Sequence, residues 1–237
     1  MQDYTQKTLN QSNNWCPTCG NTGWTLEGNP CPECKARALF KAASTKINWI
    51  PERYQGISLV ETLIKPITDY YASDLISIQN TILSNKKLIK NQYLASPINS
   101  SKSILVYSTL QLLYAGGVEI FPYFDIEEIR RIMSDIDDSK EPIFLRNYNI
   151  DPLLLYEVPV LFIKVPANPS TLCFESLQQI LDRRVRRGNG TIIISNLPWK
   201  VFCIKDKYNY VTYMSGDGDF NSLKVYDYFY MKDKTTK

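Results

Sequence analysis

The stretch QYLASPINSSKSILVYSTLQLLYAGG, residues 92–117, contains a strand pattern and a helix pattern joined by a polar turn. Residues 92–96 form a short apolar run that is typical of a strand, whereas residues 101–117 carry apolar side chains over several helical turns. The pair Gly116 and Gly117 suits the end of that helix, because glycine readily adopts the left-handed conformation found there. This order predicts a strand–loop–helix unit of an α/β domain.

The turn itself fits the frame of a phosphate-binding loop, G-x-x-x-x-G-K-[ST], with serine at both glycine positions. The residues that occupy the frame are Ser96, Ser101, Lys102 and Ser103. In such a loop the lysine neutralises phosphate oxygens and the last hydroxyl reaches a magnesium ion. Serine impairs the close backbone approach to phosphate that glycine permits. Two interpretations stay open: a nucleotide site with a damaged cradle, or a surface turn that contains Lys-Ser.

Strand and helix patterns continue to alternate after this unit. Strands are predicted at residues 118–124, 158–166 and 190–195, and helices at residues 125–136 and 170–188. Apolar strands interleaved with helices predict a mostly parallel sheet with helices on both faces. The C-terminal segment is rich in tyrosine instead, and its Gly-Asp-Gly-Asp turn at residues 216–219 favours a β-hairpin.

Composition limits the classes of protein that remain. A chain of 237 residues with 44% apolar residues can bury a core, and a net charge of +3 is too small to indicate a nucleic-acid partner by itself. The sequence lacks the ~20-residue apolar run that spans a bilayer, and its N-terminus lacks the apolar core of a signal peptide. We therefore expect a cytosolic protein with no membrane contact. Histidine is absent, so any metal site must use cysteine or carboxylate.

Two Cys-x-x-Cys pairs, separated by eleven residues, lie near the N-terminus. They consist of Cys16, Cys19, Cys31 and Cys34. Four thiolates complete the tetrahedral coordination of Zn²⁺, so we expect a closed, structural zinc site. A redox pair or two chance pairs are the alternatives. The remaining cysteines, Cys173 and Cys203, are expected to be small buried apolar residues.

These patterns divide the chain into four expected parts. They are a zinc-binding module with a helix at residues 1–48, a linker with a helical segment at 49–90, a degenerate phosphate-loop α/β domain at 91–200, and a β-hairpin-like tail at 201–237.

Several of these motifs, taken in order, resemble one family. The sequence CPTCGNTGW…CPEC, the helix after it, IPERY at residues 50–54 and TIIISN at residues 191–196 resemble bacterial and phage helicase loaders of the DnaC/DnaI type. The resemblance covers roughly residues 16 to 200 and implies an AAA+ fold of the P-loop class. It also implies that Lys102 is the phosphate-loop lysine and Asn196 the sensor asparagine. Family members bind the replicative helicase, ATP and single-stranded DNA, so the resemblance implies a DNA-replication accessory protein of a bacterial or phage-infected cell.

Departures from that family concern hydrolysis. The third predicted strand ends in Lys164 and Val165, where the resemblance calls for two acids that hold magnesium and polarise water. No Ser-Arg-Leu motif supplies an arginine finger after Asn196. We therefore expect little or no ATP hydrolysis and leave the binding of ATP or ADP open. Lys164 can instead pair with a phosphate, or with Glu157 or Asp151.

Basic and aromatic side chains indicate where single-stranded DNA would bind. The candidates are Arg183, Arg184, Arg186, Arg187, Lys86 and Lys87, with Trp24 and Trp49 as stacking rings. The alternative for the arginine run is a solvated helix end that favours cations. Expected partners are the replicative helicase or another loader subunit. Two alternative functions stay open: a zinc-containing nucleic-acid-binding protein without helicase contact, and a divergent active ATPase.

Overall fold

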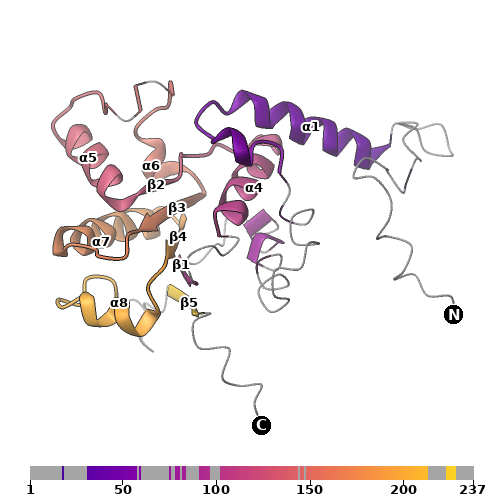
Figure 1. Cartoon of the computed structure of the whole chain (residues 1–237). Helices are drawn as coiled ribbons and strands as arrows, with labels where there is room; N and C mark the ends of the chain where they lie inside the picture. The colour runs from indigo at the N-terminus through magenta and orange to yellow at the C-terminus, as the bar shows by residue number, and fades with distance from the viewer. Residues whose placement is uncertain are drawn as a thin grey trace, which may run out of the picture.

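The computed structural model describes residues 31–57, 91–96, 102–143, 145–146, 148–212 and 223–227, with further positions at 18, 59, 75, 78–80 and 82–83. Within them, five strands form one parallel sheet in the order β2-β3-β4-β1-β5 (Figure 1). The strands are β1 (Asn91–Ala95), β2 (Phe124–Asp125), β3 (Val160–Val165), β4 (Gly190–Ser195) and β5 (Leu223–Asp227). The helices are α1 (Pro32–Lys46), α4 (Lys102–Ala115), α5 (Ile126–Asp137), α6 (Leu154–Glu157), α7 (Thr171–Val185) and α8 (Trp199–Lys205), with a short 3₁₀ turn, η1 (Glu52–Tyr54). The predicted α/β class with a parallel sheet is confirmed.

Strand residues alternate between two apolar cores, one on each face of the sheet. On β3, Leu161 and Ile163 pack with α5, α6, α7 and α8, whereas Phe162 faces α4 and the residues that follow α1. Its neighbour in register, Ile192 of β4, faces the same side as Phe162. Both faces are buried because side chains of a strand point alternately to opposite sides.

The path of the chain determines which strand ends meet. From β1 the chain crosses through α4 to β2 at the far edge of the sheet, returns through β3 and β4 to lie beside β1, and finally adds β5 on the other side of β1. All strands are parallel, so their carboxyl ends share one edge, called here the carboxyl edge, and their amino ends share the amino edge. Open α/β sheets bind ligands at the carboxyl edge, where the strand order reverses.

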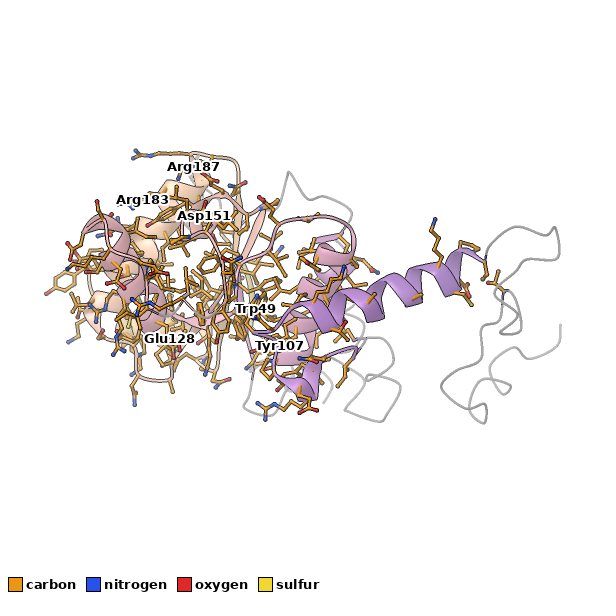
Figure 2. All side chains as sticks on the ribbon, turned by 90° about the horizontal axis from the view of Figure 1, so that it is seen from above. Trp49, Tyr107, Glu128, Asp151, Arg183 and Arg187 are labelled. Atoms are coloured by element: carbon orange, nitrogen blue, oxygen red, sulfur yellow. The ribbon has the colours of Figure 1, made fainter. Side chains whose placement is uncertain are left out.

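Helix α1 lies against α4 near its C-terminal end, while its N-terminal end points away from the sheet (Figure 2). Ile47 and Ile50, just after α1, are buried in the core that α4 shares with the sheet. The described positions between residues 59 and 83 are helical, as predicted for that segment. Among the described residues, none of the helices has the length and apolar character needed to span a membrane.

The C-terminal part of the domain differs from the prediction of a β-hairpin-like tail at 201–237. Residues 199–205 form α8 because Trp199 and Phe202, one helical turn apart, both pack against Tyr93 of β1. Strand β5 pairs in parallel with β1, so the sheet continues beyond the predicted boundary at residue 200. The turn predicted at 216–219 lies outside the described residues. The strand predicted at 118–124 is also shorter, because only Phe124 and Asp125 pair with β3.

Candidate functional site

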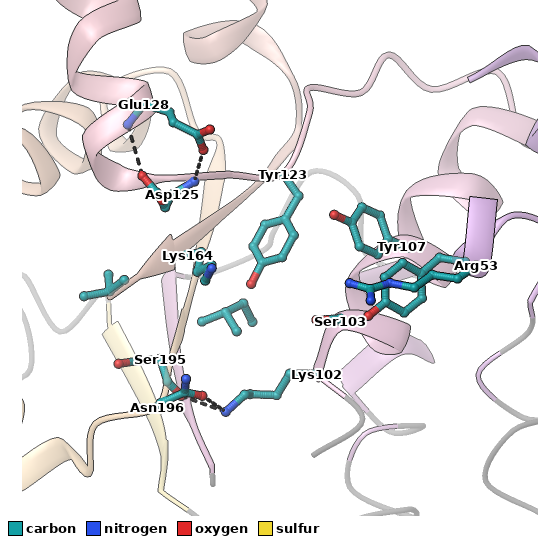
Figure 3. A pocket seen from close by; sticks show the side chains of 13 residues that line it. Arg53, Lys102, Ser103, Tyr107, Tyr123, Asp125, Glu128, Lys164, Ser195 and Asn196 are labelled. Atoms are coloured by element: carbon teal, nitrogen blue, oxygen red, sulfur yellow. Dashed lines mark hydrogen bonds between the residues drawn. The ribbon is translucent and has the colours of Figure 1, made fainter. Parts of the chain in front are cut away.

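A cavity of about 400 Å³ lies at the carboxyl edge, between the ends of β3 and β4 and the first turns of α4 (Figure 3). Its walls come from η1, α4, the segment before α5, β3 and β4. Cavities of this size are typical of small-molecule sites. The position agrees with the edge at which a parallel sheet of this connectivity binds ligands.

Lys102, the first residue of α4, forms the floor of the cavity. Its Nζ donates to the carbonyl oxygen of Ser195 at 3.0 Å and to Oδ1 of Asn196 at 2.6 Å, and also to the carbonyl oxygen of Ser96. The ammonium group therefore ties the carboxyl end of β1 to that of β4. Only 7% of Lys102 is exposed, and burial lowers its pKa to about 8.

A buried glutamine of α4 positions η1 at the cavity. Gln111 accepts from the backbone N–H of Gly56 at 2.8 Å and donates to the carbonyl oxygen of Tyr54 at 3.0 Å. Gly56 has φ 69°, a conformation that favours glycine. The ring of Tyr54 stacks on Tyr107 of α4 with centroids 4.6 Å apart. These contacts place residue 53, an arginine, beside a wall of tyrosine rings.

The wall of the cavity contains three tyrosines. Tyr123 meets Tyr107 edge-on at 5.7 Å, and the guanidinium of Arg53 lies 4.8 Å from the centroid of the Tyr54 ring. Burial raises the pKa of Tyr107 to about 12 and also raises that of Tyr123. The phenols of Tyr107 and Tyr123 therefore stay protonated at neutral pH and act as hydrogen-bonding groups without charge.

Two carboxylates line the cavity, and both take part in the start of α5. Oδ1 of Asp125 accepts from the backbone N–H groups of Glu127 and Glu128, each at 3.1 Å. Oε2 of Glu128 accepts from the backbone N–H of Asp125 at 2.9 Å, which completes a capping box. Their negative charge offsets the positive end of the α5 dipole, so the carboxylates have a structural role at this helix start.

Lys164 stands at the carboxyl end of β3, and its side chain extends into the cavity (Figure 3). It is the register partner of Asp125 across the β2–β3 pair, and its side chain is exposed. Asp151 and Glu157 precede β3 and so lie toward the amino edge, away from Lys164. Among the described residues, those that line the cavity with cationic side chains are Arg53, Lys102 and Lys164.

The structure brings together most residues of the predicted phosphate loop. Lys102, Ser103 and Asn196 line the cavity, and Ser96 accepts from Lys102 at its floor. Ser101 lies outside the described residues. The interpretation as a simple surface turn is wrong for Lys102, because its side chain is buried among backbone oxygens at the strand ends.

The predicted zinc ligands are described only in part. Cys16 and Cys19 lie outside the described residues, whereas Cys31 occupies the N-cap position of α1 and Cys34 lies on its first turn. Cys31 is buried and Cys34 is half-buried. Their spacing of three residues places both on one side of the helix start. Within the part of the chain that the structure describes, three potential metal ligands do not come together.

The arginine run resolves into structural and exposed side chains at the amino edge (Figure 2). Arg184 is fully buried, and its guanidinium donates to the carbonyl oxygens of Leu155, Val158 and Gly190 and to Oγ1 of Thr191, at 2.6–3.0 Å. The prediction that Arg184 contacts nucleic acid is therefore wrong. Its position continues the buried stripe of Leu177 and Leu181 on α7, and this helical spacing is a signal that the sequence already contained.

The neighbouring arginines are exposed to solvent, and they differ in how many contacts hold their side chains. Arg183 donates to the hydroxyl of Tyr156 at 2.8 Å and lies 3.7 Å from a carboxylate oxygen of Asp137. Arg187 also lies over the Tyr156 ring, at 5.7 Å from its centroid. Arg186 and Arg187 remain exposed at the end of α7. The other nucleic-acid candidates, Lys86, Lys87 and Trp24, lie outside the described residues, and Trp49 packs against the core beside α4.

Several residues of the cavity were missed by sequence reasoning. They are Arg53, Tyr54, Tyr107, Tyr123, Asp125 and Glu128. Residues 53 and 54 belong to IPERY, which by itself predicts only a linker. Their place depends on Gln111 of α4, more than fifty residues away in sequence, and no local pattern records that contact.

Comparison with solved structures supports the fold. A crystal structure of the DnaC helicase loader has a TM-score of 0.52 and 19% sequence identity, and the match covers 74% of this chain and 99% of that one. A crystal structure of DnaI has a TM-score of 0.51 and 15% identity, over 74% of this chain and 92% of that one. No protein-family model matches the sequence, and no curated protein matches it significantly. The resemblance to the DnaC/DnaI type is thus confirmed as a shared fold.

Proposed function

We propose that this protein is a DNA-replication accessory factor of the helicase-loader type, which binds the replicative helicase in the cytoplasm of a bacterial or phage-infected cell. The observation that supports it most is the match in fold to almost all of the chain in the crystal structure of the DnaC helicase loader. Shared fold alone does not determine function, so the order of motifs from the cysteine pairs through IPERY to TIIISN is the second support.

The same proposal includes little or no ATP hydrolysis. Metal-assisted attack on a γ-phosphate needs carboxylates that hold magnesium and a group that polarises water. At the end of β3 the cavity instead has Lys164 and Val165, and its two carboxylates cap α5. A protein of this kind would act on its helicase partner through binding energy, as a loader, an adaptor or an inhibitor.

A structural Zn²⁺ ion held by Cys16, Cys19, Cys31 and Cys34 also belongs to the proposal. The described half fits such a site, because Cys31 and Cys34 wrap the first turn of α1, as one pair of a four-cysteine site requires. This end of α1 points away from the sheet, so a zinc module there can contact a partner without blocking the cavity (Figure 1).

Single-stranded DNA is a second proposed ligand. Among the described candidates, Arg183, Arg186 and Arg187 have exposed side chains at the amino edge, whereas Arg184 is buried and takes no part. Such contacts would supply salt-dependent affinity without sequence preference.

Native mass spectrometry of the full chain with a hexameric replicative helicase tests the proposal. We expect one zinc per chain and a stable complex with the helicase, with no phosphate release above that of the helicase alone. DNA binding without a helicase complex would favour the zinc-containing nucleic-acid-binding protein. Phosphate release that Lys102→Ala abolishes would favour the divergent ATPase.

A further inference from the structure

We propose that a groove between the end of α1 and the start of α6 binds a short peptide of a protein partner and holds an arginine or lysine side chain of that peptide at the centre of the groove. The site goes beyond the proposed function, because it requires no nucleotide, zinc or DNA. Among the described residues, it shares no lining residue with the carboxyl-edge cavity.

Three adjoining cavities form this groove, called here the α1–α6 groove. The first, of about 410 Å³, lies between the C-terminal ends of α1 and α4 and the segment that leads into the edge strand β2. The second, of about 240 Å³, shares Lys46, Tyr114 and Glu119 with the first and reaches the start of α6. The third, of about 430 Å³, shares Asn149 with the second and is lined by residues within 141–152. A peptide chain can therefore lie along the groove and contact all three cavities.

Exposed apolar side chains lie at the rim of the α1–α6 groove. Tyr114 lines two of its cavities and is exposed. Ile143 follows Pro142 and Leu153 follows Pro152, and both prolines line the third cavity. These two aliphatic side chains are 68% and 49% exposed. Single exposed apolar residues are ordinary on a protein surface, but several of them around a hollow mark an interaction site. The rim therefore has the composition of a surface that a protein partner covers.

The middle cavity contains the groups that recognise a side-chain cation. The rings of Trp49, Tyr114 and Tyr148 line it together with Glu119 (Figure 2). Tyr148 packs against Phe124 instead of the other two rings, with centroids 6.4 Å apart, so the cavity stays open between the rings. A cation is attracted to the face of a tryptophan or tyrosine ring, and a nearby carboxylate adds to that attraction. An arginine or lysine side chain therefore fits this cavity better than an acidic one.

The charged side chains of the groove favour the same ligand. Glu119 and Asp151 are exposed, and neither forms an ion pair with another described residue. Arg146 lies 3.5 Å from a carboxylate oxygen of Glu141, so these two charges largely offset each other. Lys46 is exposed on the last turn of α1, where its charge opposes the negative end of the helix dipole. Two carboxylates thus remain to attract a basic peptide.

Panning a library of random octapeptides against the full chain tests the inference. We expect selection of peptides that carry arginine or lysine between apolar residues. The most enriched peptide should bind about tenfold more tightly than the same peptide with a neutral residue of similar length in place of the basic one, citrulline for arginine or norleucine for lysine. Selection of acidic peptides, or equal enrichment on a Glu119→Lys variant, would overturn the inference.

Substitutions with matched controls locate the bound peptide. Tyr114→Ala should weaken binding of the enriched peptide about fivefold, whereas Tyr208→Ala, at an exposed tyrosine outside the groove, should leave it unchanged. Asp151→Asn keeps the oxygen that accepts from the backbone N–H of Leu153 and removes the charge, so we expect about threefold weaker binding. Glu157→Gln, at an exposed acid outside the groove, is its control. Equal effects within either pair would contradict the site.

The remaining variants separate this peptide from other occupants. Lys46→Ala should tighten binding about twofold, because it removes a like charge from the rim, and weaker binding would indicate an acidic ligand instead. An oligothymidylate that displaces the peptide, and whose own binding depends on Tyr114, would assign the groove to nucleic acid. A dimer seen by analytical ultracentrifugation that Tyr114→Ala abolishes, with no peptide enriched, would assign it to a second copy of this chain. Each of these three results would overturn the inference.

Discussion

Two cations are buried at opposite ends of β4, and they differ in what surrounds them. Arg184 lies at the amino edge, fully buried, with four oxygens accepting from its guanidinium. Lys102 lies at the carboxyl edge, where three oxygens accept from its ammonium and one side opens to the cavity. Burial lowers both pKa values, to about 9 for Arg184 and about 8 for Lys102, and both groups are mainly charged at neutral pH.

The difference shows which buried cation a ligand can use. The planar guanidinium of Arg184 satisfies the carbonyl groups where α6, β3 and β4 meet, and no space remains for a ligand. Lys102 performs a similar task for β1 and β4 but faces solvent-accessible space. A buried charge is therefore structural at the amino edge and both structural and ligand-facing at the carboxyl edge.

The largest expected effect is the loss of Arg184. Arg184→Met should lower the free energy of unfolding by about 3–5 kcal/mol, because three buried carbonyl groups lose a charged donor. Urea unfolding measures the change. Arg186→Met, an exposed neighbour, should stay within about 0.5 kcal/mol of wild type. Equal effects of the two substitutions would contradict the structural role of Arg184.

The next effect depends on pH and concerns Lys102. Its pKa is about 8 in the folded state and 10.5 ordinarily, so between these values the unfolded chain binds more protons. Folding is therefore stabilised as the pH rises from about 8 to 10.5, and the penalty of burying the charge is fully present below pH 8. Relative to Lys102→Met, wild type should gain about 1–2 kcal/mol over this range.

Taking the difference in unfolding free energy between wild type and Lys102→Met at each pH removes the contributions of the other ionisable groups around the cavity. These groups are Tyr54, Tyr107, Tyr123, Asp125, Glu128, Arg53 and Lys164. Urea unfolding at pH 7, 8, 9 and 10 provides the values. A stability difference that does not change with pH would show that Lys102 is not desolvated in the folded protein.

A smaller effect is expected at the acceptor of Lys102. Asn196→Ala should cost about 1 kcal/mol, because it removes one hydrogen bond to a charged group that keeps two other acceptors. Asn168→Ala, whose side chain accepts from Lys205 in a solvent-exposed hydrogen bond, should change stability by less than about 0.5 kcal/mol. In a double-mutant cycle with Lys102→Met, the Asn196 effect should largely vanish, and full additivity would argue against the contact.

The smallest expected effect is a change in the salt dependence of DNA binding, which shows whether DNA contacts the amino edge or the carboxyl edge. If single-stranded DNA follows the amino edge, Arg186→Gln with Arg187→Gln should reduce the salt slope of binding by about 1.4, or ~0.7 per phosphate contact. Fluorescence anisotropy with a labelled oligonucleotide at several salt concentrations gives this slope. Lys164→Ala should leave it unchanged, and a slope that responds to Lys164 instead would place the DNA at the carboxyl edge.

Local patterns in the sequence were enough for the central elements of the domain, but not for α8, β5 or the bounds of β2. Apolar runs predict β3 and β4, because a strand buried on both faces needs mostly apolar side chains, and the short run Tyr93–Ala95 indicates β1. Asp125 followed by Glu128 predicts the start of α5, since the capping box needs only residues three apart. The phosphate-loop frame after β1 likewise predicts that a helix begins near its Lys-Ser pair, and α4 does begin at Lys102.

Only the tertiary structure decided what those residues face. Helical spacing places Arg184 on the apolar stripe of α7, but only the packing of α6, β3 and β4 shows which oxygens its guanidinium contacts, while Arg183, Arg186 and Arg187 remain exposed. Arg53 and Tyr54 reach the cavity through Gln111, a contact between segments far apart in the chain. Local propensity depends on neighbouring residues and can therefore be predicted from the sequence. The burial and the contacts of a charged side chain depend instead on which distant segments of the chain pack against that side chain.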